Sequence, residues 1–307
     1  MNRSHSHLDP VSEALAERLA DFPDYRVLRA LPQPYASMPG AGAPPEGRCI
    51  ALLDVETSSL DPQSGSIIEI AIMLLWVDDD GSLLGHFPIF SWQEDSGHPL
   101  DERITRLTGL RDCDLAGKAI DDEVVRRLLD RADLLCAHNA RFDAAWISKR
   151  WPDLACKPWA CSCVEVPWQE LGFEGRSQPF LLQQHGWFSH AHRAPADVWA
   201  LFWLLIQSRP DRHRDDDDSA STAERTYLQR LMTASDRQTF KLEAVGAPFS
   251  KRDVLRARGY SWDAHPLRKV WWREVLPEAV EPEQLWFARE NLPQPRLTPM
   301  TARDRHR

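Results

Sequence analysis

Residues 48–57 read Arg-Cys-Ile-Ala-Leu-Leu-Asp-Val-Glu-Thr, a stretch whose apolar run ends in two carboxylates. Such a run predicts, by its composition, a buried strand. Asp54 and Glu56 are two residues apart, so a strand points both side chains to the same face. Carboxylates placed there repel each other unless a cation compensates their charge. The alternative for this pair alone is a strand end that exposes two surface acids.

The sequence on the C-terminal side of this strand predicts an α/β fold. Residues 67–77 and 83–92 are apolar, and the Asp-Asp-Asp-Gly between them is typical of a hairpin turn. Two later strands are expected, with helical segments around them. Three hairpin-type strands followed by alternating helix and strand predict a mixed five-stranded sheet flanked by helices. The later strands are 133–137 and 159–162, and the helices are 101–107, 121–131, 140–150, 179–185 and 195–207.

Three further residues are candidates for a functional site. Asp143 lies early in a helix that follows a short strand, where the sheet edge would bring it near Asp54. His192 and Asp197 flank the start of a late helix. Each also has an ordinary explanation. Asp143 could be a surface acid and His192 a loop histidine, and the helix dipole alone favours an acid at Asp197.

Taken together, these residues form three motifs in a fixed order. In that order and spacing they resemble the DEDDh 3′–5′ exonuclease superfamily, which includes the DnaQ-like proofreading subunits of DNA polymerase III. The resemblance covers residues 48–207 and implies a ribonuclease-H-like fold. The motifs are Asp54-Val55-Glu56-Thr57, His138-Asn139-Ala140-Arg141-Phe142-Asp143 and His192-Arg193-Ala194-Pro195-Ala196-Asp197.

The resemblance implies a site for two divalent metal ions, Mg²⁺ or Mn²⁺, which oxygen ligands suit best. Asp54, Glu56 and Asp197 would hold the first ion, and Asp54 with Asp143 would engage the second. His192 would act as general base towards a metal-bound water. The product would be a nucleoside 5′-monophosphate, released by 3′–5′ exonuclease chemistry.

The resemblance also implies residues that contact the substrate. Thr57 and the backbone near Ser58 are expected to touch the terminal nucleotide, and Asn139 and Phe142 to line its pocket. Phe142 would stack on a base or else pack in the core. Family members commonly have a glycine shortly after the first motif, whereas this chain has Ser58-Ser59, which leaves its substrate preference open.

Composition limits the partners. The chain has 307 residues and a formal net charge of −9, which argues against a general basic coat for nucleic acid. The resemblance nevertheless implies single-stranded or frayed 3′ ends of DNA as the expected partner, with RNA as the alternative, and a polymerase or repair protein. The apolar runs are too short to span a bilayer, and no signal peptide is visible. The six cysteines do not have the spacing of a secreted disulfide framework. These features predict a cytoplasmic protein and no membrane partner.

We expect five segments. These are an N-terminal helix and Pro/Gly-rich linker (1–47), an exonuclease domain (48–208), an acidic linker and helix (209–238), a small module (239–293) and a tail (294–307). Residues 239–275 hold eight Lys or Arg and four acids, a local charge of +4, interleaved with aromatic side chains. They predict a small α+β module that either binds a single strand or uses its aromatics as core. The module resembles one attached to some bacterial DnaQ-like exonucleases.

Other functions remain open from the sequence. An exoribonuclease of the same family, like ribonuclease T or oligoribonuclease, fits the same motifs. A non-catalytic nucleic-acid-binding protein would be expected to lack one of the metal ligands. A zinc module would need Cys156, Cys161 and Cys163 with His185 or His190, whose spacing lacks the paired Cys-x-x-Cys of structural zinc sites. Residues 215–218, four aspartates, predict a solvated linker rather than a calcium loop.

Overall fold

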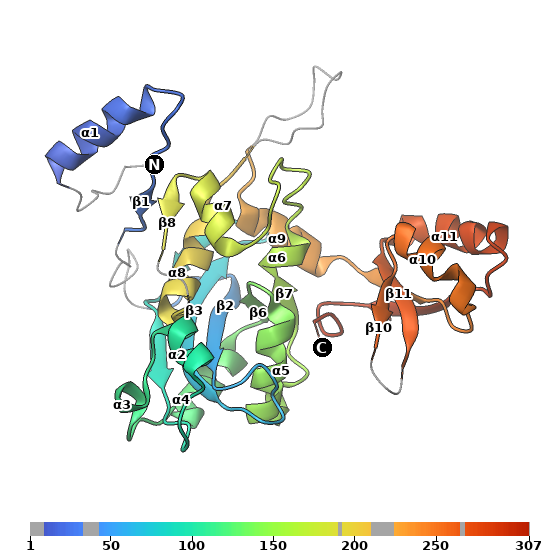
Figure 1. Cartoon of the computed structure of the whole chain (residues 1–307), viewed down its shortest axis with the longest axis horizontal. Coiled ribbons are helices and arrows are strands. Elements are labelled where there is room, and N and C mark those ends of the chain that lie inside the picture. The colour runs from blue at the N-terminus through green and yellow to red at the C-terminus, as the bar shows by residue number, and fades with distance from the viewer. Residues whose placement is uncertain (1–8, 33–42, 190–191, 210–223, 265–267, 307) are drawn as a thin grey trace. The chain divides into compact units, whose positions relative to one another are not determined.

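The computed structural model describes residues 9–32, 43–189, 192–209, 224–264 and 268–306 (Figure 1). The chain divides into two compact units, one comprising Met1–Ala234 with His306–Arg307 and the other Ser235–Arg305. The four aspartates at 215–218 lie outside the described residues. Among the described helices, none is both long and apolar enough to cross a lipid bilayer.

The first unit is built on a mixed sheet in the order β4-β3-β2-β6-β7, with β5 also paired to β3. β2 runs antiparallel to β3 and parallel to β6, which is parallel to β7. The expected mixed α/β architecture is confirmed. The strands are β2 (Arg48–Thr57), β3 (Ile67–Val77), β4 (Leu83–His86), β5 (Phe90–Gln93), β6 (Leu134–Ala137) and β7 (Trp159–Cys161).

The sheet has six strands rather than the expected five. The segment expected as one strand at 83–92 forms two, β4 and β5, which pair with opposite halves of β3. Pro88 lies in the break between them. Because proline has no N–H to donate, it cannot continue a hydrogen-bonded ladder.

Helices cover both faces of the sheet. The side chains of Cys49, Ala51, Leu53 and Val55 pack with α4 and α5 in one apolar core. α8 contacts β2 and β3, and its apolar residues are buried. Asp54 and Glu56 alternate with that core set, so they belong to the other face of β2. The helices of this unit are α1 (Pro10–Ala20), α2 (Glu102–Thr108), α3 (Asp112–Leu115), α4 (Asp122–Arg131), α5 (Ala140–Arg150), α6 (Ser162–Glu165), α7 (Gln178–Gln184), α8 (Ala194–Leu205) and α9 (Tyr227–Asp236). The small strands β1 (Arg29–Ala30) and β8 (Trp187–Phe188) pair with each other.

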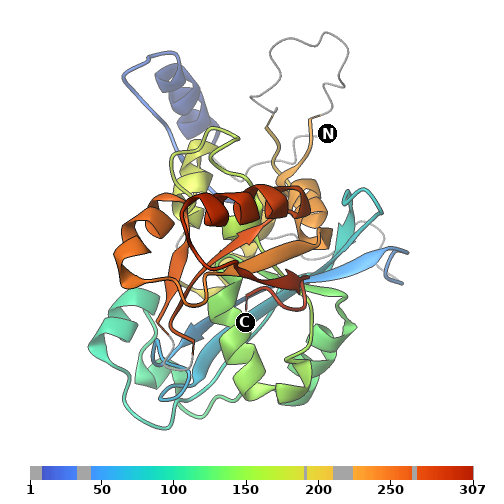
Figure 2. The same cartoon turned by 90° about the vertical axis from the view of Figure 1, so that its right-hand side faces the viewer.

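The second unit is a four-stranded antiparallel sheet in the order β10-β11-β9-β12, with α11 lying across it (Figure 2). Leu242, Leu255, Tyr260 and Phe287 are among the buried side chains of its own apolar core. The expected small α+β module is therefore present. Its elements are β9 (Thr239–Glu243), α10 (Arg252–Ala257), β10 (Ser261–Asp263), β11 (Val270–Val275), α11 (Pro277–Arg289) and β12 (Arg296–Met300).

β12 lies within residues 294–307, which the sequence assigned to a tail. It pairs with β9 along its whole length and completes the sheet. Only Leu297 and Met300 are large apolar residues in Arg296–Met300, and Pro299 interrupts the donors. An edge strand of this kind carries little hydrophobic signal, because it needs only one paired side.

Candidate active site

Asp54 and Glu56 lie near the C-terminal end of β2. Asp54 is opposite Ala71 of β3, and Glu56 is opposite Glu69. The ladder shifts register between Glu56 and Thr57, so regular pairing ends where the carboxylates stand. The strand thus delivers both side chains to one face, as the two-residue spacing predicts.

Asp197, from the first turn of α8, joins this pair. Carboxylate oxygens of Asp54, Glu56 and Asp197 all lie within 4.8 Å of one another. They come from two elements that pack together, β2 and α8. A cluster of three carboxylates at this separation has the oxygen donors that a divalent cation prefers.

Asp143 is placed beside this group by α5. Its side chain is 2% exposed, and its Oδ1 accepts a hydrogen bond from the backbone N–H of Val55 at 3.2 Å. Val55 lies between the two acids of β2, so Asp143 reaches the same strand end. α5 begins after Asn139, whose left-handed backbone (φ 78°) turns the chain from β6 into the helix.

His192 stands at the start of α8 on an exposed position. Its backbone is left-handed, with φ 67°. The Asp197 Oδ2 atom accepts hydrogen bonds from the backbone N–H of His192 at 2.7 Å and of Arg193 at 3.2 Å. Asp197 therefore closes the loop that presents the histidine, in addition to facing the other acids.

The acids share an environment that disfavours their negative charge. Burial, with the charges of Asp143 and Asp197 after it, raises the pKa of Asp54 well above its usual range. Burial, Asp197 and Glu69 raise the pKa of Glu56 to about 8, against the lowering effect of Arg193. Burial likewise raises the pKa of Asp143 well above its usual range, although hydrogen bonds to its carboxylate oppose this shift.

The same holds for Asp197, whose pKa burial raises to about 6, although its hydrogen bond from His192 and the charge of that histidine act in the opposite direction. Acids that are held together at this cost in desolvation favour a positive charge among them. The all-oxygen donor set therefore fits a divalent metal ion.

The four residues expected to contact substrate have the following positions. The Thr57 side chain is 4% exposed, and its hydroxyl donates to the backbone oxygen of Ser59 at 2.6 Å. The Ser58 backbone N–H donates to Ser66 at 2.9 Å. The side chain of Asn139 does not cap α5. Phe142 packs against the core and lies 6.1 Å from Trp146, ring centre to ring centre. Their contacts with a nucleotide stay a prediction.

The turn after the first motif works without the glycine that the family commonly has there. None of residues 58–66 has a positive φ. Serines close the loop instead, with Ser66 N–H donating to the Ser58 hydroxyl at 2.9 Å. The later Gly65 is needed for space, because a Cβ there would lie 2.9 Å from the ring of Trp146.

Two charged residues of the site were not assigned from the sequence. Glu69 is 1% exposed on β3, and it binds Arg193, the N-terminal residue flanking α8. Glu69 Oε1 also accepts a hydrogen bond from Gln93 of β5 at 2.7 Å. A lone acid inside the apolar run Ile67–Val77 was the available signal, since an unpaired carboxylate is rarely buried.

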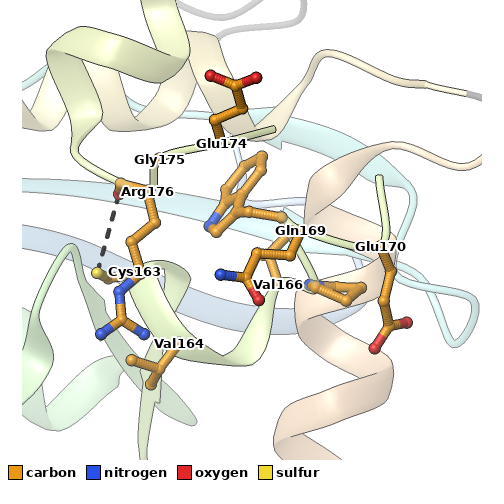
Figure 3. A pocket seen from close by; sticks show the side chains of 10 residues that line it. Cys163, Val164, Val166, Gln169, Glu170, Glu174, Gly175 and Arg176 are labelled. Atoms are coloured by element: carbon orange, nitrogen blue, oxygen red, sulfur yellow. Dashed lines mark hydrogen bonds between the residues drawn. The ribbon is translucent and has the colours of Figure 1, made fainter. Parts of the chain in front are cut away.

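A cavity of about 430 Å³ lies elsewhere in this unit, lined by residues of the stretch 163–176 (Figure 3). Cys163 and Arg176 meet on one side of it, where the thiol approaches the Arg176 backbone oxygen at 3.9 Å. None of the expected catalytic residues lines this cavity.

The cysteines do not assemble a metal site among the described residues. All six are free thiols. The cluster formed by the carboxylates of Asp54, Glu56 and Asp197 includes no cysteine. Cys161 is buried in the apolar core, and Cys156 is exposed. His190, one of the two histidines considered for zinc, lies outside the described residues.

The chain has relatives among PolC-type DNA polymerases. No protein-family model matches the chain. It is similar to PolC-type DNA polymerase III of Listeria monocytogenes, at 27% identity over 187 residues, and of Listeria welshimeri, at 34% over 178 residues. These matches cover 56% and 53% of this chain but 12% of each polymerase. A polymerase of the same type from Streptococcus pyogenes is 32% identical over 102 residues, which are 33% of this chain and 7% of that protein.

Two solved structures are similar to parts of this chain. Exonuclease X in complex with 5′ overhanging duplex DNA has 21% identity and a TM-score of 0.37, covering 50% of this chain and 86% of that one. Escherichia coli exonuclease I in complex with a dA16 oligonucleotide has 13% identity and a TM-score of 0.45, covering 80% and 68%. Both scores are below 0.5. The three motifs stand in order on a mixed sheet, their acids converge, and the two Listeria relatives are PolC-type polymerases, so the chain is similar to the DEDDh, DnaQ-like exonuclease superfamily.

Proposed function

We propose that this protein is a metal-dependent 3′–5′ exonuclease that removes nucleoside 5′-monophosphates from 3′ ends of DNA. One observation carries the proposal. Asp54, Glu56 and Asp197 come within 4.8 Å of one another although almost 150 residues separate the first from the last. Asp143 is buried beside them against the backbone of Val55. The catalytic domain in this proposal is residues 48–208.

The carboxylates fit magnesium or manganese, because all the donors are oxygen. In the proposal Asp54, Glu56 and Asp197 hold one ion, and Asp54 with Asp143 engages a second. Bound there, the ions supply activation of a water and stabilisation of the departing 3′ oxygen. The raised pKa values of Glu56 and Asp197, which burial chiefly causes, support this role, because a cation would compensate the negative charges that burial disfavours.

His192 is the proposed general base. His192 is exposed, so its imidazole has access to water. Its backbone N–H is bound by Asp197, one of the clustered carboxylates. A ring nitrogen would take the proton of the attacking water as the bond to phosphorus forms.

The substrate contacts belong to the same proposal. The Thr57 hydroxyl already donates to Ser59, so Thr57 and Ser58 would meet the terminal nucleotide chiefly through backbone groups. The Asn139 side chain is not used as a helix cap and is available to a nucleotide. Phe142 would line the pocket from the core side.

DNA is the preferred substrate because the matched relatives are by name DNA polymerases. A polymerase or repair protein as partner, and a cytoplasmic location, are parts of the same proposal. Six free thiols support a reducing compartment.

A time course on matched single-stranded DNA and RNA oligonucleotides tests the proposal, with the label at the 3′ end or the 5′ end. With Mn²⁺ or Mg²⁺, the 3′ label should appear at once as mononucleotide, while the 5′ label shortens one residue at a time. EDTA should stop both. Faster digestion of the RNA would show that the protein is an exoribonuclease rather than a DNA exonuclease. Binding without any product in either metal would leave only a binding protein.

A further inference from the structure

The second unit carries large aromatic side chains on its surface that its own core does not use. Phe249 is 78% exposed and Trp262 is 48% exposed. Neither is among the residues of the apolar core of this unit, which is built around Leu242 and Phe287. Exposed rings of this size are costly in water, and they commonly mark a binding surface.

Arginine side chains and a third aromatic ring connect these two residues. The guanidinium of Arg252 lies 4.7 Å from the centre of the Phe249 ring, and that of Arg256 lies 5.9 Å from the centre of Trp271. Trp271 is paired across the β10–β11 hairpin with Trp262, at a ring separation of 5.5 Å. A continuous surface therefore runs from Phe249 over α10 to the hairpin.

The charges on this surface are available to a ligand. Arg252 and Arg256 share one acid, Asp253, at 3.5 and 3.8 Å, in pairs that are largely exposed. Arg268, which is 57% exposed, pairs at 3.8 Å with Asp263, which is 15% exposed, so this pair is exposed on the arginine side only. Exposed pairs of this length contribute little and exchange readily for other anions.

Two other arginines of the unit differ in this respect. Arg258 and Arg273 both bind Glu283, whose side chain is only 4% exposed. Tyr260 donates to the same carboxylate at 3.1 Å. These arginines satisfy a buried acid, so they serve the structure of the unit and are not part of the surface.

We propose that Phe249, Arg252, Arg256, Trp262 and Arg268, the aromatic–arginine surface, bind single-stranded DNA. The arginines contact phosphates, and bases stack on Phe249 and Trp262. The surface has three arginines against two acids, Asp253 and Asp263, and this positive balance in a chain of net charge −9 suits a polyanion at this place. Only an unpaired strand offers free base faces to exposed rings, which favours it over a duplex. The inference rests on the proposed exonuclease only in that the bound strand is taken to be its substrate.

Fluorescence anisotropy of the full chain with a labelled oligothymidine in EDTA measures this binding without cleavage. Trp262→Ala and Phe249→Ala should each raise Kd about tenfold, since each removes one stacked base. Arg252→Gln with Arg256→Gln should lower the slope of log Kd against log salt by about 1.4, because two phosphate contacts to a single strand are lost. A duplex of the same length should bind more weakly.

Leu285→Ala and Arg289→Gln are matched controls. Both residues are exposed on α11 of the same unit and lie outside the surface. They should change neither Kd nor the salt slope, and thermal melting checks that every variant is folded. An unchanged Kd and slope in folded Trp262 and Arg252/Arg256 variants would overturn the inference. Displacement of the oligonucleotide by polyglutamate as readily as by unlabelled oligothymidine would overturn it in favour of an acidic protein partner.

The two proposals fail separately. A protein that binds through this surface and cuts nothing would contradict the exonuclease alone. A protein that cuts from the 3′ end, while its surface variants bind like the wild type, would contradict only the inference drawn here.

Discussion

Glu69 and Arg193 join the start of β3 to the loop that carries His192. Arg193 Nη2 donates to Glu69 Oε1 at 2.8 Å, and Arg193 Nε donates to Glu69 Oε2 at 3.1 Å. Oε2 also accepts the backbone N–H of Ala194 at 2.9 Å. Glu69 and Asp197 thus bind donors of three consecutive residues, His192 to Ala194, and together they hold the loop at the start of α8.

We therefore predict that Glu69→Gln lowers kcat about tenfold, because an amide cannot accept all of these hydrogen bonds or pair with the guanidinium. The free energy of unfolding should fall by ~2 kcal/mol, since Glu69 is buried but Arg193 is partly exposed. Glu102→Gln, in an exposed pair with Arg106, is the control and should change neither.

A double substitution separates positioning from general damage. If Glu69 acts through His192, adding Glu69→Gln to a His192→Asn enzyme should cause little further loss of kcat. Hydrogen exchange at the amides of Arg193 and Ala194 should also become faster in the single variant without metal. Full additivity of the two losses would show that Glu69 does not position the histidine.

His192→Asn should lower kcat by about 10²- to 10⁴-fold, the range that loss of a general base produces. Asparagine is chosen because it tolerates the left-handed backbone at this position better than alanine does. Mn²⁺ affinity, measured by calorimetry, should stay close to that of the wild type. A large loss of metal affinity would mean that the histidine is a ligand rather than a base.

Asp54→Asn should abolish cleavage while DNA binding in calcium survives. The same change should stabilise the metal-free protein, because it removes one of several mutually repelling carboxylates. Adding Mn²⁺ at a hundredfold excess over Kd should stabilise the wild type by ~2.7 kcal/mol and the variant far less. Thermal melts with and without metal measure both effects, and retained cleavage would refute the assignment of Asp54.

The stability of the metal-free protein should fall with rising pH. The pKa of Glu56 is raised from its ordinary 4.5 to about 8, chiefly by burial. A carboxyl with a higher pKa in the folded state stabilises the fold fully below its unfolded pKa, and this contribution is lost as pH rises through the folded pKa. Between about pH 6.5 and about pH 8, unfolding in EDTA should become easier by ~2 kcal/mol.

Two half-buried histidines do not titrate in this pH window. His138 and His185 have pKa values lowered to about 4 by burial, so both are neutral above pH 6.5. Glu56→Gln should reduce the slope, and Mn²⁺ should remove it. Denaturant titrations across the window test the sign, and a stability that rises with pH would contradict the buried, uncompensated carboxylates described above.

The three motifs predicted the site residues because the positions of these residues follow from strand and helix geometry. A two-residue spacing on β2 fixes the shared face of Asp54 and Glu56, and the start of α8 fixes Asp197. Where sequence reasoning fell short, one cause was local and the others were tertiary. Pro88 splits one expected strand into two, and β12 forms only because β9 offers it a paired edge. The apolar neighbours of Glu69 marked it as unusual in the sequence. The sequence could not show which cation neutralises it, because Arg193 lies 124 positions away.

Asp197, in the first turn of α8, has two roles. The carboxylate proposed to bind metal is also the one that holds the amides of His192 and Arg193. Any shift of that group on ion binding must be felt by the loop of the histidine. The amide NMR signals of these two residues should therefore report metal occupancy directly, even in an enzyme whose catalytic imidazole has been replaced.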